Sequence, residues 1–348
     1  VYGGRFGLGS KDTVPAHIIA VYNNMVAPQP KPEFTLSIED DVTHLSLPVT
    51  ENPDTTPAGT TSCKFWGLGS DGTVGANKDS IKIIGDNTDM FAQGYFFYDS
   101  KKSGGITVSH LRFGSSPITS TYLINKANFV HCPSYVTKYD MVQDLVPGGT
   151  FLLNCIWTPD QLDSQLPASM KRYIAENNIH FYIINGIQIA EEVGLPGRAS
   201  TILQSAFFAI SGILPVEKAI ELMKAAVVKK FSKKGEAVVN ANFAGIDRGA
   251  QEIVKVDVPD SWKTAERAPR RLEVPTDRPE MKKFVKEILD PVGRLHGDDL
   301  PVSAFADRAD GVYPAGSAAF EKRGIAITVP QWDGTKCAQC NLCAMVCP

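Results

Sequence analysis

Four cysteines near the C-terminal end of the sequence have the spacing of iron–sulfur ligands. The run is Cys337-x2-Cys340-x2-Cys343-x3-Cys347-Pro348. In bacterial ferredoxins with this spacing the first three thiolates bind one [4Fe–4S] cluster, and the fourth ligates a second cluster. Iron and sulfide are soft, and thiolate is the protein ligand that suits them. The run therefore predicts iron–sulfur binding.

The alternatives for this run are structural zinc and disulfides. Zinc sites normally separate two C-x2-C pairs by a dozen or more residues, and this run does not. The other three cysteines, Cys63, Cys132 and Cys155, lie singly in apolar segments and are expected to be buried small hydrophobic residues. A two-cluster domain needs a second cysteine run, the 348 residues hold none, and they do not begin with Met. We therefore expect an internal segment of a longer polypeptide.

A glycine-rich segment is the second candidate for chemistry. Residues 67–75 read GLGSDGTVG, after an apolar segment at 62–66 and before a segment with helical features at 76–84. A G-x-G-x-x-G between a strand and a helix can bind phosphate, because glycine lets the backbone approach the anion and the helix N-terminus supplies N–H donors. The other interpretation is a tight strand–helix turn in which glycine serves only backbone geometry.

Basic residues further along favour a ligand with several phosphates. Lys101 and Lys102 lie between serines and glycines, and taken alone they could equally be a solvated turn. An NAD site would need an acid about 20 residues after the loop, for which Asp86 and Asp89 are candidates. The lysines instead favour coenzyme A or NADP. Arg198, before a Ser/Thr-rich helix start, is either another anion contact or a solvated residue beside a helix cap.

The composition excludes several classes of protein. A hydrophobic content of 43% with 21% charged residues is typical of globular proteins with sizeable cores. The net charge of −3 favours neither nucleic acid nor an anionic membrane as partner. The longest apolar stretch is too short to span a bilayer, and no signal-peptide pattern is present. The acidic triplet at 39–41 is either a metal site or, more commonly, a solvated turn.

The elements that must position these residues alternate between strands and helices from residue 61 onward, which predicts an α/β fold with an open, mostly parallel sheet. Strands are predicted at 34–38, 62–66, 91–98, 106–113, 128–132, 150–156, 179–184 and 324–329. Helices are predicted at 13–25 (with Thr13 as the N-cap), 76–84, 134–145, 162–175, 200–212, 215–234, 236–254 and 280–289. A turn-rich stretch at 51–59 marks a domain boundary, and the proline- and charge-rich stretch at 259–316 predicts a connector over the surface of larger domains.

The order of these motifs resembles the middle of the pyruvate:ferredoxin (flavodoxin) oxidoreductase family. The resemblance rests on residues 67–78 (GLGSDGTVGANK), 84–88 (IGDNT), 98–105 (YDSKKSGG), 110–114 (HLRFG) and the cysteine run, and it covers essentially all of the chain. It implies four parts: the end of a transketolase C-terminal-like α/β domain at 1–60, a gamma domain that binds coenzyme A at 61–262, a connector at 263–318, and the first half of a ferredoxin-like α+β module with two [4Fe–4S] clusters at 319–348.

The resemblance also implies a function. Family enzymes decarboxylate pyruvate on thiamine diphosphate with Mg²⁺, transfer the acetyl group to coenzyme A and pass electrons through [4Fe–4S] clusters to ferredoxin or flavodoxin. The thiamine site would lie outside this segment, so no catalytic residue is assigned and the segment alone is not expected to be active. The implied coenzyme A contacts are Asp71, Gly72, Thr73, Lys101, Lys102, Arg198 and Ser200, the last at a position where family members often carry an amide. The implied cluster ligands are Cys337, Cys340, Cys343 and Cys347.

Expected partners are ferredoxin or flavodoxin, the remaining domains of the same polypeptide and a second copy in a homodimer. The expected location is the cytoplasm, or an anaerobic organelle in a eukaryote. Two other functions stay open. One is a pyruvate:NADP oxidoreductase, in which the same core is fused to a flavin reductase, and only sequence beyond residue 348 would separate it. The other is a nucleotide-binding scaffold whose cysteines hold structural zinc.

Overall fold

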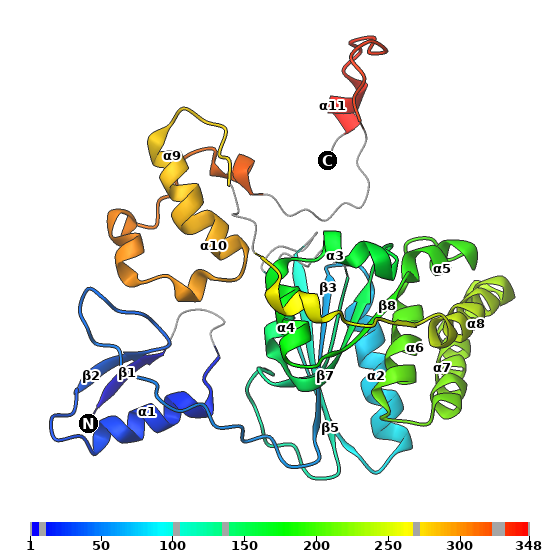
Figure 1. Ribbon diagram of the computed structural model, residues 1–348, viewed down its shortest axis with the longest axis horizontal. Coiled ribbons are helices and arrows are strands. Elements are labelled where there is room, and N and C mark those ends of the chain that lie inside the picture. Colours follow the sequence, from blue (N-terminus) through cyan, green and yellow to red (C-terminus); the bar gives the residue numbers. More distant parts are fainter. Residues whose placement is uncertain are drawn as a thin grey trace.

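The centre of the molecule is a twisted sheet of seven strands, shown in Figure 1. The structure is a computed structural model that describes residues 2–6, 12–99, 105–133, 139–266, 272–321 and 331–346. The strands of this sheet, in the order β4-β5-β3-β6-β7-β8-β9, are β3 (Thr61–Leu68), β4 (Phe91–Tyr98), β5 (Ile106–Gly114), β6 (Ala127–Pro133), β7 (Leu145–Asn154), β8 (His180–Ile184) and β9 (Val254–Lys255).

The sheet is mixed but mostly parallel, which confirms the predicted fold class. Strands β3, β6, β7 and β8 are parallel neighbours. Strand β5 is antiparallel to both β3 and β4, so β4 runs in the same direction as the parallel set. The short edge strand β9 is antiparallel to β8 and was not predicted. The predicted strands between residues 62 and 184 are each present, most of them longer than predicted.

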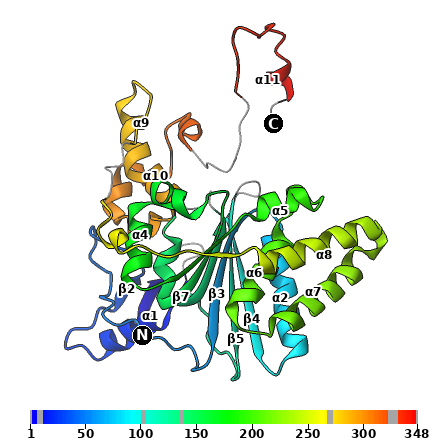
Figure 2. The same cartoon turned by 45° about the vertical axis from the view of Figure 1, so that its right-hand side comes forward.

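Helices cover both faces of the sheet (Figure 2). One face carries α2 (Thr73–Asn87), α5 (Gly186–Glu192), α6 (Ser200–Ser211), α7 (Val216–Phe231) and α8 (Glu236–Gln251). The other carries α3 (Leu162–Gln165) and α4 (Ala168–Glu176). Successive strand residues point to opposite faces. Phe65 therefore packs in the core under α2 and α6, and its neighbour Trp66 packs in the other core.

Two of the predicted helices differ most from the structure. Residues 134–138 of the helix predicted at 134–145 lie outside the described residues, and 141–144 form only the 3₁₀ turn η2 (Met141–Asp144) before β7 begins at Leu145. Met141 and Val142 are buried in the α4-side core, so a single turn suffices to bury the apolar residues that suggested a helix. The helix predicted at 162–175 is divided in two because Pro167 forces the residue before it, Leu166, into an extended conformation.

The N-terminal part is a small separate unit. Strands β1 (Gly3–Phe6) and β2 (Glu33–Leu36) pair in parallel, and α1 (Pro15–Met25) connects them. The N-cap of α1 is Val14 and not Thr13 as predicted, although a proline does occupy the first turn. The acidic triplet is a turn: the Asp40 carboxylate accepts hydrogen bonds from the Thr43 hydroxyl and from three N–H groups of its own loop, which hold its pKa below the usual range.

The connector is more structured than predicted. A helical stretch runs through α9 (Pro279–Phe284), the π-turn η6 (Val285–Leu289) and α10 (Asp290–Gly293). It buries its own apolar cluster, made up of Val274, Met281, Phe284, Val285 and Ile288. The connector also contacts the N-terminal unit, because the Val302 N–H donates to the Glu39 carbonyl (2.9 Å) and the Ser303 N–H donates to Asp41 (2.9 Å).

The remaining elements are short. They are η3 (Pro159–Gln161), η4 (Ser232–Lys234), η5 (Asp260–Thr264), η7 (Gly297–Asp299), η8 (Val302–Arg308), η9 (Ser317–Phe320) and α11 (Leu342–Val346). The strand predicted at 324–329 lies outside the described residues. Among the helices that the structure describes, none has both the length and the apolar character needed to cross a membrane.

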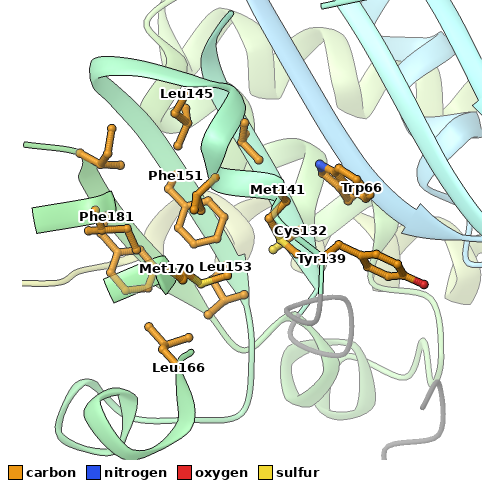
Figure 3. Packing of buried hydrophobic residues seen from close by; sticks show 14 of the residues in the cluster. Trp66, Cys132, Tyr139, Met141, Leu145, Phe151, Leu153, Leu166, Met170 and Phe181 are labelled. Carbon is orange, nitrogen blue, oxygen red and sulfur yellow. The ribbon is translucent and has the colours of Figure 1, made fainter. Parts of the chain in front are cut away.

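Aromatic packing on the α4 side of the sheet is expected to contribute to the stability of the domain. Phe151 is fully buried there and its ring lies 5.2 Å from that of Phe181 (Figure 3). We expect Phe151→Ala to lower the free energy of unfolding by about 3–5 kcal/mol, because it removes buried apolar area and leaves a cavity. Urea titration followed by circular dichroism measures this loss. The control Phe91→Ala, at a position 47% exposed on the edge strand, is expected to cost far less, and an equal loss would contradict the assignment.

Candidate functional site

The glycine-rich segment forms a tight loop between β3 and α2. The Asp71 carboxylate holds it, since one oxygen accepts the Leu68 N–H (2.8 Å) and the other accepts the Thr73 N–H (2.8 Å). Ser70 and Gly72 both have positive φ, at 77° and 89°, a conformation that glycine adopts without strain. The strand, loop and helix predicted from the G-x-G-x-x-G pattern are therefore present, and α2 begins at Thr73, three residues earlier than predicted.

Two of the loop glycines are required by packing. A Cβ on Gly67 would lie 2.8 Å from Thr73 Oγ1, and a Cβ on Gly72 would lie 2.9 Å from Ser200 Oγ. Gly75 differs, because a Cβ there would meet no atom within 4 Å. Gly67 and Gly72 thus fit the interpretation of glycine as a geometric need, and Gly75 leaves the start of α2 open to approach.

A cavity of about 480 Å³ opens beside this loop. It lies at the carboxyl ends of β3 and β4, where the chain order of the sheet reverses: the helix after β3 leads to β4, whereas β6 pairs on the other side of β3. Open α/β sheets bind their ligands at such a switch point. The cavity is lined by Leu68, Gly69, Ser70, Asp71, Gly72, Val74, Gly75, Tyr98, Asp99, Gly105, Ile106 and Thr107.

The structure brings several of the predicted site residues together. Asp71 and Gly72 line the cavity, Thr73 is the first residue of α2, and Ser200, the first residue of α6, touches Gly72. The starts of two helices therefore meet at the loop. The buried Gln204 side chain fixes this arrangement by donating to Ser80 Oγ on α2 (2.9 Å).

The other predicted contact residues are Arg198, Lys101 and Lys102. Arg198 is exposed, two residues before α6, and it does not line the cavity. Lys101 and Lys102 lie outside the described residues, although Asp99 and Gly105 on either side of their segment both line the cavity. Sequence reasoning missed Tyr98 and Thr107. Their position on adjacent strands follows from the antiparallel pairing of β4 with β5, which no short sequence motif predicts.

Cys337 and Cys340 lie in an exposed loop, and Cys343 lies in the short helix α11 that follows it. Cys337, Cys340 and Cys343 are exposed, and Cys347 lies outside the described residues. The Cys337 sulfur accepts the Gln339 N–H (3.4 Å), and this bond, followed by one from the Trp332 indole, lowers the pKa of the thiol. An exposed thiol such as Cys337, whose ionised form is favoured by N–H groups, has the donor chemistry that an iron–sulfur cluster needs.

These thiols are not gathered around a common centre. Within the described parts of the chain, no three His, Cys, Asp or Glu side chains lie close enough to hold a metal ion. The remaining cysteines are buried as predicted. Burial raises the pKa of Cys155 to about 11 and also raises the pKa of Cys63 and Cys132, so these thiols stay protonated.

Two buried histidines lie on central strands. Burial lowers the pKa of His131, on β6, to about 4. Burial lowers the pKa of His110, on β5, to about 2, with help from the nearby charges of Lys64 and Arg112. Both rings are therefore neutral at physiological pH. Neither of them lines the cavity, so they belong to the framework of the sheet.

The neutral state of His131 is expected to make the fold sensitive to acid. The unfolded chain takes up a proton there near pH 6.5, but the folded chain does so only near pH 4, so stability is lost as pH falls through this window. We expect the drop in unfolding free energy between pH 7 and pH 5 to be about 2 kcal/mol smaller in His131→Gln. Urea titrations at both pH values measure it. The control His180→Gln, at an exposed position, is expected to keep the wild-type drop.

The sheet order and the loop cavity at the switch point define an open α/β domain of the ligand-binding type. Comparison with protein families is more specific. Residues 62–252, more than half of the chain, match the family model described as pyruvate ferredoxin/flavodoxin oxidoreductase. The chain belongs to this family. Residues 268–326 match a second model, EKR, described as a domain of unknown function.

Curated relatives agree with this membership. The chain is 52% identical to a pyruvate-flavodoxin oxidoreductase of Enterobacter agglomerans and 51% identical to a pyruvate:ferredoxin oxidoreductase of Moorella thermoacetica. Both alignments cover 100% of this chain and 29% of the relative, so the chain spans less than a third of their length. A pyruvate dehydrogenase [NADP(+)] of Cryptosporidium parvum is 44% identical over 100% of this chain and 19% of the relative.

A solved structure, the pyruvate oxidoreductase subunit PORC of Thermotoga maritima, is similar over 57% of this chain and 99% of that chain. Its sequence identity is 16% and its TM-score is 0.47.

Proposed function

We propose that this chain is the central part of a pyruvate:ferredoxin or pyruvate:flavodoxin oxidoreductase, in which it binds coenzyme A and carries iron–sulfur ligands. The observation that carries the proposal is the cavity between the glycine loop and β4–β5, in a domain of this family. The division into parts at 1–60, 61–262, 263–318 and 319–348 is proposed with it. Thiamine diphosphate and Mg²⁺ would be bound by other domains of the intact enzyme.

The cavity suits the nucleotide end of coenzyme A, which carries several phosphates. The N–H groups in the first turn of a helix have no partner within the helix, and the helix dipole favours negative charge there. In α2 the Asp71 carboxylate already accepts the Thr73 N–H, which leaves those of Val74 and Gly75, two residues that line the cavity. Asp71 thus shapes the loop, and the donors of α2 meet the ligand.

Other residues would contact the same ligand from outside the loop. Ser200 offers a hydroxyl at the start of α6, in contact with Gly72. Lys101 and Lys102 belong to the segment between two residues that line the cavity, and Arg198 is exposed just before α6. Cationic side chains hold phosphates as point charges or bidentate partners. Held in this way, the nucleotide leaves the thiol of coenzyme A free to reach the acyl group supplied by the thiamine-binding domains.

The two lysines provide the test of this site. In the intact enzyme we expect the double variant Lys101→Ala/Lys102→Ala to raise the KM for coenzyme A about tenfold or more, since each lost charge-assisted bond is worth about 1.5–3 kcal/mol at most. The KM for pyruvate is expected to stay unchanged.

The matched control is Lys233→Ala/Lys234→Ala, which removes two neighbouring lysines after α7, away from the residues that line the cavity. It is expected to keep the wild-type KM for coenzyme A. An unchanged KM in the Lys101/Lys102 variant, or an equal rise in both variants, would remove the lysines from the site.

The cysteine run is proposed to hold iron–sulfur clusters. Cys337, Cys340 and Cys343 would ligate one [4Fe–4S] cluster and Cys347 a second, completed by cysteines further along the polypeptide. When bound, such clusters supply one-electron transfer. The chain contributes the thiolates, and at Cys337 the N–H groups of Gln339 and Trp332 favour the ionised form. Ferredoxin or flavodoxin would accept the electrons, and a homodimer is the proposed assembly.

Iron and sulfide content tests this part. In the intact enzyme purified without oxygen, we expect Cys340→Ala to lose about four iron and four sulfide per chain together with visible absorbance. Alanine is used because it cannot act as a ligand. Cys155→Ala, at a buried position, is expected to keep the full content. Wild-type protein that is colourless and holds one zinc ion at these cysteines would instead support the structural-zinc alternative.

The second candidate is a pyruvate:NADP oxidoreductase with the same core. The observation in its favour is the 44% identity to a pyruvate dehydrogenase [NADP(+)] over the whole chain. The loop and the cysteine run would act in the same way in both enzymes. An assay of the intact enzyme separates them, because only the NADP enzyme would reduce NADP⁺ without added ferredoxin or flavodoxin.

A further inference from the structure

A small cluster of buried polar side chains lies beneath the glycine loop, between α2 and the sheet. Its members are Asn77 on α2 and Thr107 and Ser109 on β5, which are 4%, 4% and 0% exposed. Asn77 Nδ2, Thr107 Oγ1 and Ser109 Oγ are buried, and none of them makes a hydrogen bond to a residue that the structure describes. Natural proteins rarely leave buried polar atoms without partners, so the cluster needs an explanation.

The two hydroxyls project from the sheet toward α2. Thr107 pairs with Gly67 and Ser109 pairs with Phe65 in the antiparallel register of β5 with β3. Directly opposite residues of an antiparallel pair point to the same face. That face is the one covered by α2, because a Cβ on Gly67 would lie 2.8 Å from Thr73 Oγ1 and because Phe65 packs in the core beneath α2. Figure 2 shows α2 lying along this side of the sheet.

The asparagine lies on the facing side of the helix. Thr73 lies over Gly67, and Ile81, two turns later, contacts Gly94, which pairs with Leu111. Asn77 is midway, one turn from each, on the same helix face. Four helix residues advance about 6 Å, and two strand residues advance about 6.6 Å. Thr73, Asn77 and Ile81 therefore lie over Thr107, Ser109 and Leu111 in turn, which places the Asn77 amide over the hydroxyl of Ser109.

We propose that a buried water molecule is bound by Asn77, Thr107 and Ser109 and ties the first two turns of α2 to β5. A buried water typically makes about three hydrogen bonds to otherwise unsatisfied groups. Here an amide donor and two hydroxyls, each able to donate or accept, supply that number. The water satisfies all three side chains at once, which no pair of them does alone.

The water has a consequence for the loop cavity. Thr107 on β5 lines one wall, and Val74 and Gly75 on α2 line the opposite wall. A bridge between α2 and β5 just below these residues holds the two walls at a fixed separation. Asn77 and Ser109 do not line the cavity and are positioning residues for it. This consequence for ligand binding rests on the proposed coenzyme A site, whereas the water site itself does not.

A crystal structure and two variants test the proposal in the intact enzyme. At a resolution that shows ordered solvent, we expect density for one water between the three side chains, absent in Ser109→Ala. Losing a satisfied bond lowers the melting temperature, whereas deleting a hydroxyl that had no partner would leave it unchanged or raise it. We therefore expect a lower melting temperature in Ser109→Ala and in Asn77→Leu, and a dissociation constant for coenzyme A raised about threefold to tenfold in both.

The control is Ser205→Ala on α6, which removes a buried hydroxyl that has a partner, the Ile246 carbonyl at 2.6 Å. It is expected to lower the melting temperature but to keep the affinity for coenzyme A. The absence of water density between the three side chains would overturn the proposal. A Ser109→Ala variant as stable as wild type would also overturn it. If Asn77→Leu fails to fold, the Ser109→Ala variant still tests whether the water is bound. If wild-type enzyme does not bind coenzyme A, the proposed function fails, while the density and the melting temperatures still decide the water site.

Discussion

The close approach of side chains to two glycines is the constraint on which the site depends. Without a Cβ at Gly67, the Thr73 side chain packs directly against β3, and without one at Gly72, the start of α6 reaches the loop. These contacts fix the direction in which α2 leaves the sheet. Because α2 covers β3, β4 and β5, its direction also sets the position of the wall formed by Val74 and Gly75. A side chain at either glycine would displace α2 or α6, and with it the cavity.

The face of β3 away from α2 shows why this framework is rigid. Lys64 is buried there in an ion pair with Asp144 from the turn before β7, and it lies opposite His110 on β5. A buried charge that lost its partner would be costly, so the pair ties the two strands together through the intervening β6. The positive charges of Lys64 and Arg112 add to the effect of burial in keeping His110 neutral. The strand that delivers the loop is therefore held on both faces, by apolar packing on one and by a charge network on the other.

The sequence predicted the features that depend on neighbouring residues. The strands of the sheet, the glycine loop and most of the helices could be identified because their apolar periods and turn residues are local. Sequence reasoning failed where tertiary contacts determine the local structure. Met141 and Val142 are buried by a single 3₁₀ turn, and the connector forms its own core around Phe284. The strand register places Tyr98 and Thr107 at the cavity, and no short motif predicts that register. Helix packing brings Ser200 to Gly72, 128 positions away in the sequence, which a motif cannot predict either. The Ser/Thr-rich helix start indicated a helix cap at this point, and only the resemblance to a family pointed to Ser200 as a ligand contact.

The two candidate sites differ in how much of their geometry the chain fixes by itself. At the loop, Asp71 and the two glycines hold the backbone donors in place before any ligand arrives, so binding there orders little. At the cysteine run, the exposed thiols lie on a loop with positive φ at Gln339 and Asn341 and on the short helix α11, and few other contacts hold them. In the proposed cluster site, their convergence would draw on the free energy of metal binding, as in other metal-dependent folds. With the proposed clusters bound, a unit built from both sites would keep its loop cavity when the metal is lost but would lose the local order at the cysteines.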